Sequence, residues 1–537
     1  MLKKKMFIAL IDVFCIFMLF MSNLPPFKLL IQTAVSESDE TESMDQVISD
    51  TGLLTIDIHT IDGNNPTYKE ADPPDGCLGS SIKDNAYVKG YCEITNMDSG
   101  GSFASRMKLK VRGNTSARAA GPDGKLPYKL VLKEAVDLFG DGLGDNRFIL
   151  LSGAGETLNT YLGFLIGQCC GIEWTPKCRY VNLILNDDYR GIYLLVQAPD
   201  GVSLSNHVGS DGFMVECDAY WWKENKYIKT NAVSNAMAYV VKYPDEDRIT
   251  EAQFEEIHRF IDILEREIID TGKSELIDWE TFVAWIMTRD ITGEMDAAGS
   301  NIYYYIEDFY VKNPAYCKLH MGPLWDFDNS FVQNNSWSEF HYSSTTYFPY
   351  LFMNEKFVDQ YIERWDVISS SLYAVLTSEL QELIIAAGES IDDSRRLDAE
   401  RWDRPLITLE EEAENKLAWL QARIAWIDEI LGAEKTSGYI KNTVYATASD
   451  DSKTLDILLC DDGYNSVQFL VWNDDDGQDE SIWWEAHLNK SGYWECKVDL
   501  SRFYSKGFFV IDAYAQLDYD IFLVSRSFSY VFSDWNG

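Results

Sequence analysis

The succession of two hydrophobic periodicities is the feature of this sequence that most restricts its fold. Short segments between Gly52 and Asp218 alternate apolar and polar residues, which is the pattern of half-buried β-strands. Between Glu251 and Leu431 the apolar residues recur every three or four positions, as in amphipathic helices. After Gly432 the alternation returns in short runs separated by Gly and Asp turns. We therefore expect an α+β protein with a β-rich lobe, a helical lobe and a C-terminal all-β sandwich module.

Individual segments carry these patterns. The runs expected as strands are Leu54–His59, Ala86–Ile94, Met107–Val111, Tyr180–Leu185, Ile192–Val196, Phe213–Asp218, Ile302–Ile306, Leu455–Cys460, Val467–Trp472 and Tyr493–Val498. The runs expected as helices are Thr157–Cys170, Glu251–Ile269, Trp279–Arg289, Glu355–Ser369, Ala374–Ala387 and Leu409–Leu431.

The N-terminus has the layout of an export signal. Three lysines at positions 3–5 precede an apolar run from Met6 to Met21, which is short for a membrane-spanning helix. We expect residues 1–35 to be a signal peptide or an N-terminal membrane anchor, and the protein to be secreted or associated with the cell surface. Residues 36–51 are acidic and rich in Ser, so they are expected to form a linker. A first domain then covers 52–434, and the β-sandwich surface module covers 435–537.

The charge balance narrows the range of partners. The chain has 46 Lys and Arg against 86 Asp and Glu, a formal net charge of −40. Such a field repels nucleic acid and anionic membranes at long range, so we expect no nucleic-acid partner and membrane contact only through the N-terminal segment. An anionic substrate would need locally basic residues or a bound metal.

The cysteines indicate neither zinc nor an obligatory disulfide framework. Of the ten, nine follow the N-terminal segment, and none forms a Cys-x-x-Cys pair. Most are expected to be small buried residues. Disulfides between Cys77 and Cys92, or between Cys460 and Cys496, would suit an exported chain, and the sequence leaves them open.

Gly293–Phe331 carries the candidate chemistry. Asp296 is followed five residues later by Asn301, then by a strand and a turn that leads into Trp325-Asp326-Phe327-Asp328. Phosphoryl-transfer enzymes use such a spacing, in which one Asp orients the substrate hydroxyl while the Asn and a second Asp hold divalent metal against ATP. The alternative is a turn in which Asp caps backbone N–H groups and the aromatic residues belong to the core.

A second candidate lies between two expected strands. Arg112-Gly113-Asn114-Thr115-Ser116 is followed by a loop with Gly121 and Gly124, and then by Lys125 to Leu132. A loop of Gly and hydroxyl residues can place backbone N–H groups close to a phosphate, with a lysine of the next strand supplying charge. An ordinary hairpin loop has the same composition.

The region from about Leu53 to Leu431 resembles the spore-coat protein H (CotH) kinase family, whose members have an atypical protein-kinase-like fold. The resemblance is carried by Arg112–Ser116, Pro127–Leu130, Asn186–Tyr193, Gly212–Glu216, Asp296 with Asn301, and Gly322–Asp328. It implies a two-lobed, exported protein kinase that uses ATP and Mg²⁺ or Mn²⁺. Its acceptors would be Ser or Thr hydroxyls of a surface or spore-coat-type protein.

The resemblance also implies roles for single residues. Asp296 would be the catalytic-loop Asp, Asp326 a catalytic residue and the principal metal ligand, and Asn301 and Asp328 further metal ligands. Contacts to the nucleotide would come from Arg112, Asn114, Ser116, Glu216 and a lysine, with Lys129 favoured over Lys125. Two positions depart from the family pattern, because Glu294 replaces an Asn before the catalytic Asp and Gln197 replaces a Glu.

The tail from about Val467 to Tyr514 resembles the GBS Bsp-like repeat of bacterial cell-surface proteins. That resemblance implies a surface location and a cell-wall or surface polymer as a further partner. Two other readings remain open. One is a catalytically inactive surface adhesin on a kinase-like scaffold, and the other is a glycosidase that uses two of the carboxylates, which would leave Asn301 unexplained. Among six scattered histidines, only His320 lies near the candidate site.

Overall fold

The computed structural model describes residues 47–531 apart from 49, 76, 78–80, 154–157, 201, 231–236, 295–300, 311–316, 332–345, 434–443, 450–452, 462, 474–479, 505–506 and 518–519. The predicted signal or anchor segment, most of the predicted linker and Asp296 lie outside the described residues. Within the described part of the chain, none of the helices combines the length and hydrophobicity that a bilayer crossing requires.

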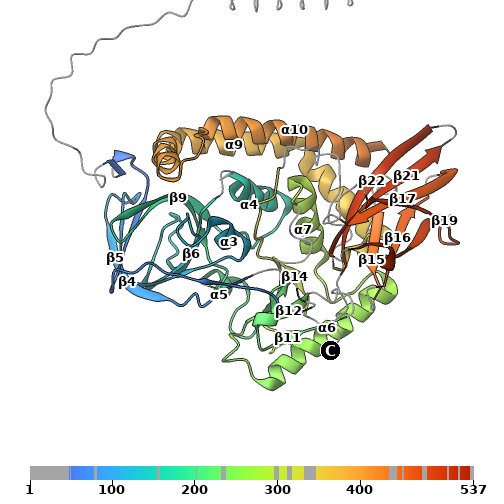
Figure 1. The fold of residues 1–537 in the computed structure, drawn as a ribbon, viewed down its shortest axis with the longest axis horizontal. Coiled ribbons are helices and arrows are strands. Elements are labelled where there is room, and N and C mark those ends of the chain that lie inside the picture. The colour runs from blue at the N-terminus through green and yellow to red at the C-terminus, as the bar shows by residue number, and fades with distance from the viewer. Residues whose placement is uncertain are drawn as a thin grey trace, which may run out of the picture. The chain divides into compact units, whose positions relative to one another are not determined.

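The N-terminal strands form a closed barrel (Figure 1). In spatial order it contains β1 (Thr55–Thr60), β4 (Val88–Thr95), β5 (Phe103–Val111), β6 (Tyr128–Val136), β7 (Asp145–Leu151), β9 (Asp188–Gln197) and β8 (Cys178–Leu185). Neighbouring strands are antiparallel except β1 and β8, which close the barrel in parallel. Because side chains alternate between the two faces of a strand, Met107, Leu109 and Val111 of β5 fill the barrel while the residues between them face outward.

Short elements surround the barrel. They are β2 (Lys69–Ala71), β3 (Ser81–Lys83), α3 (Thr115–Ala120), α5 (Val202–His207) and the 3₁₀ turn η1 (Trp221–Lys223). The expected loop after Arg112 is therefore partly helical, since Thr115–Ala120 forms α3. Two alanines follow Arg118 there and favour a helical turn.

A five-stranded sheet stands next in the chain, so the second half of the first domain is less purely helical than expected. Its order is β11 (Tyr227–Ile228), β12 (Ala238–Tyr243), β10 (Phe213–Asp218), β13 (Ile302–Ile306) and β14 (His320–Met321). The predicted strands Phe213–Asp218 and Ile302–Ile306 are confirmed and lie side by side. This register places Glu216 directly opposite Tyr303.

The helices pack around these sheets. They are α4 (Leu158–Cys170), α6 (Glu251–Thr271), α7 (Trp279–Thr292), α8 (Phe348–Leu351), α9 (Glu355–Trp402) and α10 (Leu409–Ala433). One hydrophobic core joins the outer side of the barrel to α4, α7 and α9, through residues such as Val196, Ile166 and Trp285. Helix α7 begins at Asp278, whose side chain accepts a hydrogen bond from Thr281 N, and ends at Gly293 with φ +59°.

The two helices expected between Glu355 and Ala387 are one helix. Helix α9 continues without a break through Ser369–Ser371 to Trp402. Leu372, Leu376 and Leu380 are buried at four-residue spacing beyond those serines, so the apolar stripe that drives helix packing is not interrupted. Serine alone is not a helix breaker.

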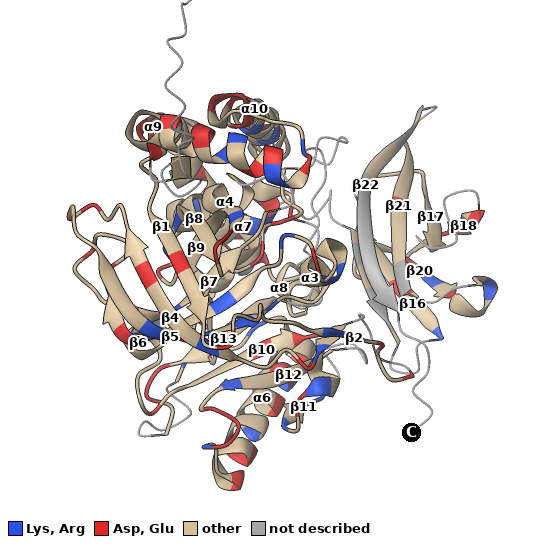
Figure 2. Cartoon of the chain, turned by 60° about the vertical axis from the view of Figure 1, so that its left-hand side comes forward, with Lys and Arg blue, Asp and Glu red and all other residues tan. Residues whose placement is uncertain are grey.

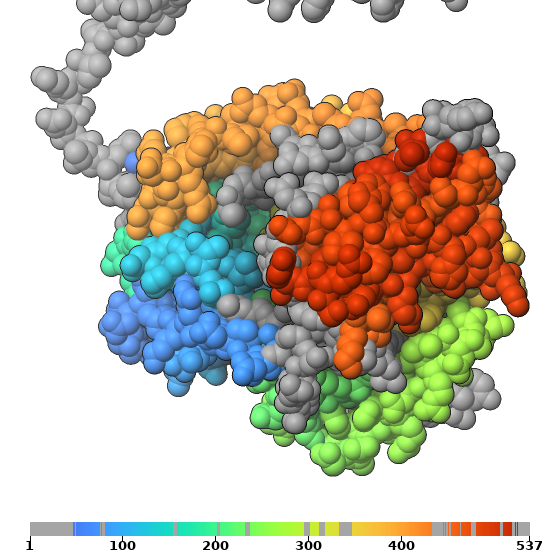
Figure 3. All heavy atoms as spheres, turned by 45° about the vertical axis from the view of Figure 1, so that its right-hand side comes forward, coloured from blue at the N-terminus to red at the C-terminus, as the bar shows by residue number. Residues whose placement is uncertain are grey.

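The C-terminal strands form two four-stranded antiparallel sheets. In the space-filling view their atoms, coloured orange to red, gather in one region of the surface (Figure 3). One has the order β15 (Val444–Ala448), β16 (Thr454–Cys460), β20 (Tyr493–Asp499) and β19 (His487–Leu488). The other has the order β18 (Ile482–Glu485), β17 (Ser466–Asn473), β21 (Gly507–Leu517) and β22 (Asp520–Val531). Ile457, Val498, Phe469 and Ile511 belong to one apolar core that includes both sheets.

Neither candidate disulfide is formed in the described part of the chain, because Cys77, Cys92, Cys460 and Cys496 all remain thiols. In the C-terminal sheet, Cys460 lies opposite Tyr493, and Cys496 lies opposite Ile457. The two thiols are thus displaced by three residues along paired strands, which is about 10 Å and too far for a disulfide.

Candidate active site

Asp326 lies in a turn whose backbone carbonyl oxygens accept hydrogen bonds from a buried arginine. The residue has φ +58°, a left-handed backbone conformation that is uncommon for residues other than Gly. Arg289 of α7 donates hydrogen bonds from Nη2 to the carbonyl oxygen of Trp325, at 2.6 Å, and from Nη1 to that of Asp326, at 2.9 Å. The guanidinium also lies over the ring of Phe327, 4.4 Å from its centroid. The turn is therefore anchored at its backbone, which leaves the Asp326 carboxylate available.

Two glycines of α4 make room for the same turn. A Cβ atom on Gly163 would lie 2.4 Å from the Phe327 ring, and one on Gly167 would lie 2.0 Å from Leu324. Phe327 also meets the Phe164 ring edge-on, with 5.9 Å between centroids. Close packing of the helix against the turn thus requires Gly at both positions.

The end of the turn is fixed by a buried polar network. Asn159 Nδ2 donates to the carbonyl oxygens of Asp328, at 3.1 Å, and Ser330, at 3.0 Å. Ser330 Oγ donates to the carboxylate of Glu294 at 2.6 Å. Glu294, which departs from the expected family residue, is therefore a structural partner of the Asp326 turn.

The environment of Asp326 combines burial with positive charge. Burial raises the pKa of its carboxyl above the ordinary value, while Arg112 and Arg289 and the backbone N–H of Asp328 act in the opposite direction. The Arg112 guanidinium lies over the Trp325 ring, 5.4 Å from its centroid. A desolvated carboxylate of this kind gains stability when a cation binds to it.

The five-stranded sheet contributes a second polar group beside Arg112. Lys242 Nζ lies 2.9 Å from Glu216 and 3.3 Å from Asp218, and Tyr303 donates a hydrogen bond to Glu216. Burial raises the pKa of Glu216 to about 6, because it outweighs the attraction of Lys242. The two carboxylates in turn raise the pKa of Lys242 against the effect of its burial. The charge of Arg112 acts on Tyr303, which connects this group to the Asp326 turn.

The two lysines proposed for the nucleotide have different surroundings. Lys129 Nζ lies 2.5 Å from Asp200, which also accepts a hydrogen bond from Arg147 at 3.2 Å. Lys125 is buried, with its Nζ 2.5 Å from Asp398 of α9. Burial lowers the pKa of Lys125 to about 8 in spite of that partner. Lys125 therefore connects the barrel to α9.

The remaining predicted nucleotide contacts are only partly available. Asn114 Oδ1 accepts hydrogen bonds from Ser81 Oγ, at 2.6 Å, and from the backbone N–H of Ile82, at 3.4 Å. Ser116 lies on α3, close to Gly113 at φ +76°. Asn114 thus holds β3 against the loop, and Ser116 stays partly exposed beside it.

The metal ligands implied by the resemblance are described in part. Asn301 precedes β13 with φ +64°, and Asp328 is exposed two residues after Asp326. In the described part of the chain no three His, Cys, Asp or Glu side chains converge into a complete metal site. The donors nevertheless suit Mg²⁺ or Mn²⁺, since carboxylate and amide oxygens are the ligands these ions prefer, and phosphates and water complete their coordination.

Sequence reasoning missed Arg289, which bonds to the Asp326 turn, and Lys242, which pairs with Glu216. It also missed Lys110 and Lys223, whose charges act on each other. Arg289 could have been noticed as a cation near the end of an otherwise apolar helix. The lysines carry no local signal, because Lys110 and Lys242 lie on ordinary strands and Lys223 ends the short 3₁₀ turn η1. Acidic positions are spread over α9, α10 and many loops, while basic positions also occur on strands of the barrel and the neighbouring sheet (Figure 2).

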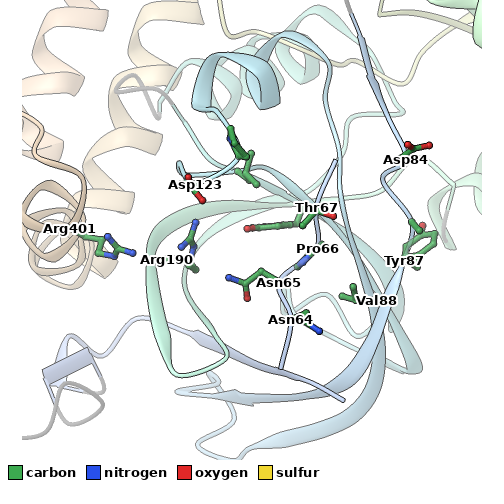
Figure 4. Close-up of a pocket in the computed structure, with 14 residues that line it drawn as sticks. Asn64, Asn65, Pro66, Thr67, Asp84, Tyr87, Val88, Asp123, Arg190 and Arg401 are labelled. Carbon is green, nitrogen blue, oxygen red and sulfur yellow. The ribbon is translucent and has the colours of Figure 1, made fainter. Parts of the chain in front are cut away.

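Two other features contain none of the predicted catalytic or nucleotide-binding residues. A cavity of about 720 Å³ opens at one end of the barrel, with Arg190 and Arg401 on one side and Tyr87 on the other (Figure 4). None of its lining residues carries a predicted role. His320 stacks on Tyr305, with 5.2 Å between ring centroids, and burial lowers its pKa, so it belongs to the packing of β14.

A comparison with protein families gives one finding. The family model described as CotH kinase protein matches residues 109–427, which is more than half of the chain and includes every predicted catalytic and metal-binding residue. No curated protein matches the chain.

Proposed function

Because the chain belongs to the CotH kinase protein family, we propose that it is a protein kinase that transfers the γ-phosphate of ATP to Ser or Thr hydroxyls of a protein acceptor. The observation that supports this most is the position of Asp326. The charges of Arg112 and Arg289 act on its carboxylate, and the turn that carries it is anchored by two helical residues, Asn159 and Arg289. Glu294, just after α7, holds the end of the turn through Ser330. Such a fixed carboxylate is what a metal-dependent phosphotransfer site requires.

The local charge supports an anionic substrate. Interacting with Asp326, Asp200, Glu216, Asp218 and Glu224 are seven cationic side chains, namely Lys110, Arg112, Lys129, Arg147, Lys223, Lys242 and Arg289. This local excess of positive charge occurs in a chain whose net charge is −40. Nucleotide phosphates would complement it.

We assign the roles as follows. Asp326, with Asn301 and Asp328, would hold Mg²⁺ or Mn²⁺, which when bound would neutralise charge on the β- and γ-phosphates. Arg112 would contact the phosphates from the barrel side, and Glu216 would orient Lys242 and Tyr303. Asp296 would accept a hydrogen bond from the acceptor hydroxyl and orient its oxygen for attack at phosphorus.

The localisation and the surface partner remain part of the proposal. An N-terminal export signal would place the kinase outside the cytoplasm or on the cell surface. The C-terminal strands would contact a wall or surface polymer, for which the exposed Trp483 and Tyr504, 51% and 88% accessible, are suitable contacts. A surface adhesin without activity is the alternative.

The direct test measures phosphotransfer by the full chain. Labelled ATP with Mg²⁺ or Mn²⁺ should give autophosphorylation or transfer to an acceptor protein, and Mg·ATP should raise the melting temperature. Asp326→Asn should remove both effects while the protein stays folded. Asp270→Asn, at an exposed position on α6, is the matched control and should behave as the wild type. Equal phosphotransfer by Asp326→Asn, or no response of the wild type to Mg·ATP, would contradict the kinase assignment.

A further inference from the structure

Two lysines stand side by side on the outer face of the barrel. The register of β5 and β6 places Lys110 directly opposite Lys129. Their strand neighbours Leu109, Val111, Tyr128 and Leu130 are buried in the barrel core, so the alternation of side chains turns both lysines outward. Arg112 follows two residues after Lys110, about 7 Å further along the chain direction.

The two lysines differ in their counter-charges. Lys129 is paired with Asp200, and Arg147 shares the same carboxylate. Lys110 is only partly exposed, and no carboxylate of the described residues lies within ion-pair distance of it. Its ammonium lies over the Tyr87 ring, 4.9 Å from the centroid. A single carboxylate, Asp200, thus faces Lys110, Lys129 and Arg147.

The surroundings of Lys110 are unfavourable for a cation in the absence of an anion. Burial lowers the pKa of its ammonium, Lys129, Lys223 and Arg112 lower it further, and Asp200 only partly opposes them. Lys223 itself is held by Ser81 Oγ at 2.7 Å and by the carbonyl oxygen of Ile82 at 3.0 Å. A half-buried cation among three others is stabilised when an anion binds between them.

We propose that Lys110 is the lysine that binds the phosphate chain of the nucleotide, the role that the sequence resemblance assigns to Lys129 or Lys125. This inference rests on the proposed kinase function. When bound, the phosphate chain would contact Arg112 and Lys110, and the Lys110 ammonium would donate to phosphate oxygens, while Asp326 would hold the divalent metal. Lys129 is a neighbouring charge held by Asp200, and Lys125 is a structural ion pair with Asp398.

The spacing suits a polyphosphate and not an isolated phosphate. Lys110 lies near the end of β5 and Arg112 directly follows that strand, so two cations whose charges act on each other lie about 7 Å apart along the chain. A chain of phosphates can contact both, whereas a monophosphate reaches only one of them. Affinity should therefore depend on Lys110 for ATP and for inorganic tripolyphosphate, and much less for AMP.

The test compares four variants of the full chain by calorimetric titration with Mg·ATP, AMP and sodium tripolyphosphate. Lys110→Met should weaken ATP binding at least tenfold, and Lys110→Arg should retain most of it. Lys108→Met is the matched control, because Lys108 is an exposed residue on the same outer face of β5, two residues earlier. This variant should bind ATP as the wild type does. Lys129→Met should weaken binding less than Lys110→Met.

A second readout separates a binding role from a structural one. Without ligand, Lys110→Met should melt at the same temperature as the wild type or higher, since it removes repulsion. The rise in melting temperature that Mg·ATP causes in the wild type should disappear. A large loss of unliganded stability, or normal ATP affinity of Lys110→Met together with lost affinity of Lys129→Met, would overturn the assignment. Failure of the wild type to bind ATP would instead refute the kinase function, and tripolyphosphate binding that depends on Lys110 would then support a polyanion site alone.

Discussion

Arg289 donates a hydrogen bond to the backbone carbonyl oxygen of Asp326, and not to its carboxylate. The difference matters because a cation bonded directly to the carboxylate would compete with a metal. Bonded to the backbone, the guanidinium fixes the turn and adds positive potential while the carboxylate oxygens remain available for metal binding. Arg289 is thus a positioning residue for the proposed chemistry.

Arg289→Lys should damage both stability and nucleotide binding. A lysine keeps the charge but cannot donate to two carbonyl oxygens in the fixed geometry of a guanidinium. Leaving buried carbonyls without donors should lower the free energy of unfolding by about 2–4 kcal/mol. Urea unfolding measures this loss of stability. Titration with Mg·ATP measures the loss of nucleotide affinity that displacement of Asp326 should cause.

The matched control is Arg364→Lys. Arg364 also donates to a carbonyl oxygen, that of Cys170 at 3.1 Å, but its side chain is 25% exposed and lies away from the turn. The Arg364→Lys variant should bind the nucleotide as tightly as the wild type does. Equal losses of affinity in the two variants would show that Arg289 acts only through general stability.

Gly163→Ala should be destabilising although Ala is the better helix former. The preference for Ala in a helix is worth about 1 kcal/mol, but the new Cβ would lie 2.4 Å from the Phe327 ring. The overlap should cost about 1–3 kcal/mol and shift the Asp326 turn. The melting temperature should fall, and the rise in melting temperature that Mg·ATP causes should become smaller.

Gly388→Ala, in α9, should be stabilising, in contrast to Gly163→Ala. There the nearest atom to a new Cβ is Ile384 Cγ2 at 3.4 Å, which is an ordinary contact. This variant should be stabilised by up to about 1 kcal/mol and should keep its nucleotide affinity. Similar behaviour of the two glycine variants would mean that α4 does not pack against the turn as described.

Glu216 should make stability depend on pH in a known direction. Its pKa rises from 4.5 to about 6 on folding, mainly because of burial. Glu216 therefore binds its proton more tightly in the folded chain than in the unfolded chain. Protonation of Glu216 stabilises the fold fully below pH 4.5, and this stabilisation is lost as the pH rises through about 6. The full change is about 2 kcal/mol.

Glu216→Gln removes this titration, so the comparison with the wild type isolates it. The free energy of unfolding of the wild type minus that of the variant should fall between pH 4 and pH 7. Urea unfolding at a series of pH values measures the difference. Parallel curves for the two proteins would mean that Glu216 titrates at its ordinary pKa.

Lys125→Met should affect stability and leave the nucleotide site intact. The substitution leaves the Asp398 carboxylate without its partner at 2.5 Å in a buried setting, which should cost about 3–5 kcal/mol. The double variant Lys125→Met with Asp398→Leu should recover most of this loss, because no lone charge remains. ATP affinity, measured well below the melting temperature, should match the wild type. Lost affinity in a folded Lys125→Met protein would restore Lys125 as the nucleotide lysine.

The sequence by itself determined the strands and helices, the family and the candidate acids. Strands such as Ile302–Ile306 and helices such as Leu409–Ala433 follow from hydrophobic periodicity, which is a local property. The family follows from short motifs whose order the matched region contains. Asp326 could be singled out because its motif is contiguous in sequence.

Only the tertiary structure decided which cations are available to a ligand. Lys125 and Lys129 are both plausible in sequence, but Asp398 and Asp200 come to them from distant parts of the chain. Lys110 became a candidate because the pairing of β5 with β6 placed it beside Lys129, and no carboxylate of the residues that the structure describes lies within ion-pair distance of it. The charge state and freedom of a side chain depend on its spatial neighbours, and those are set by how the barrel, the sheet and the helices pack.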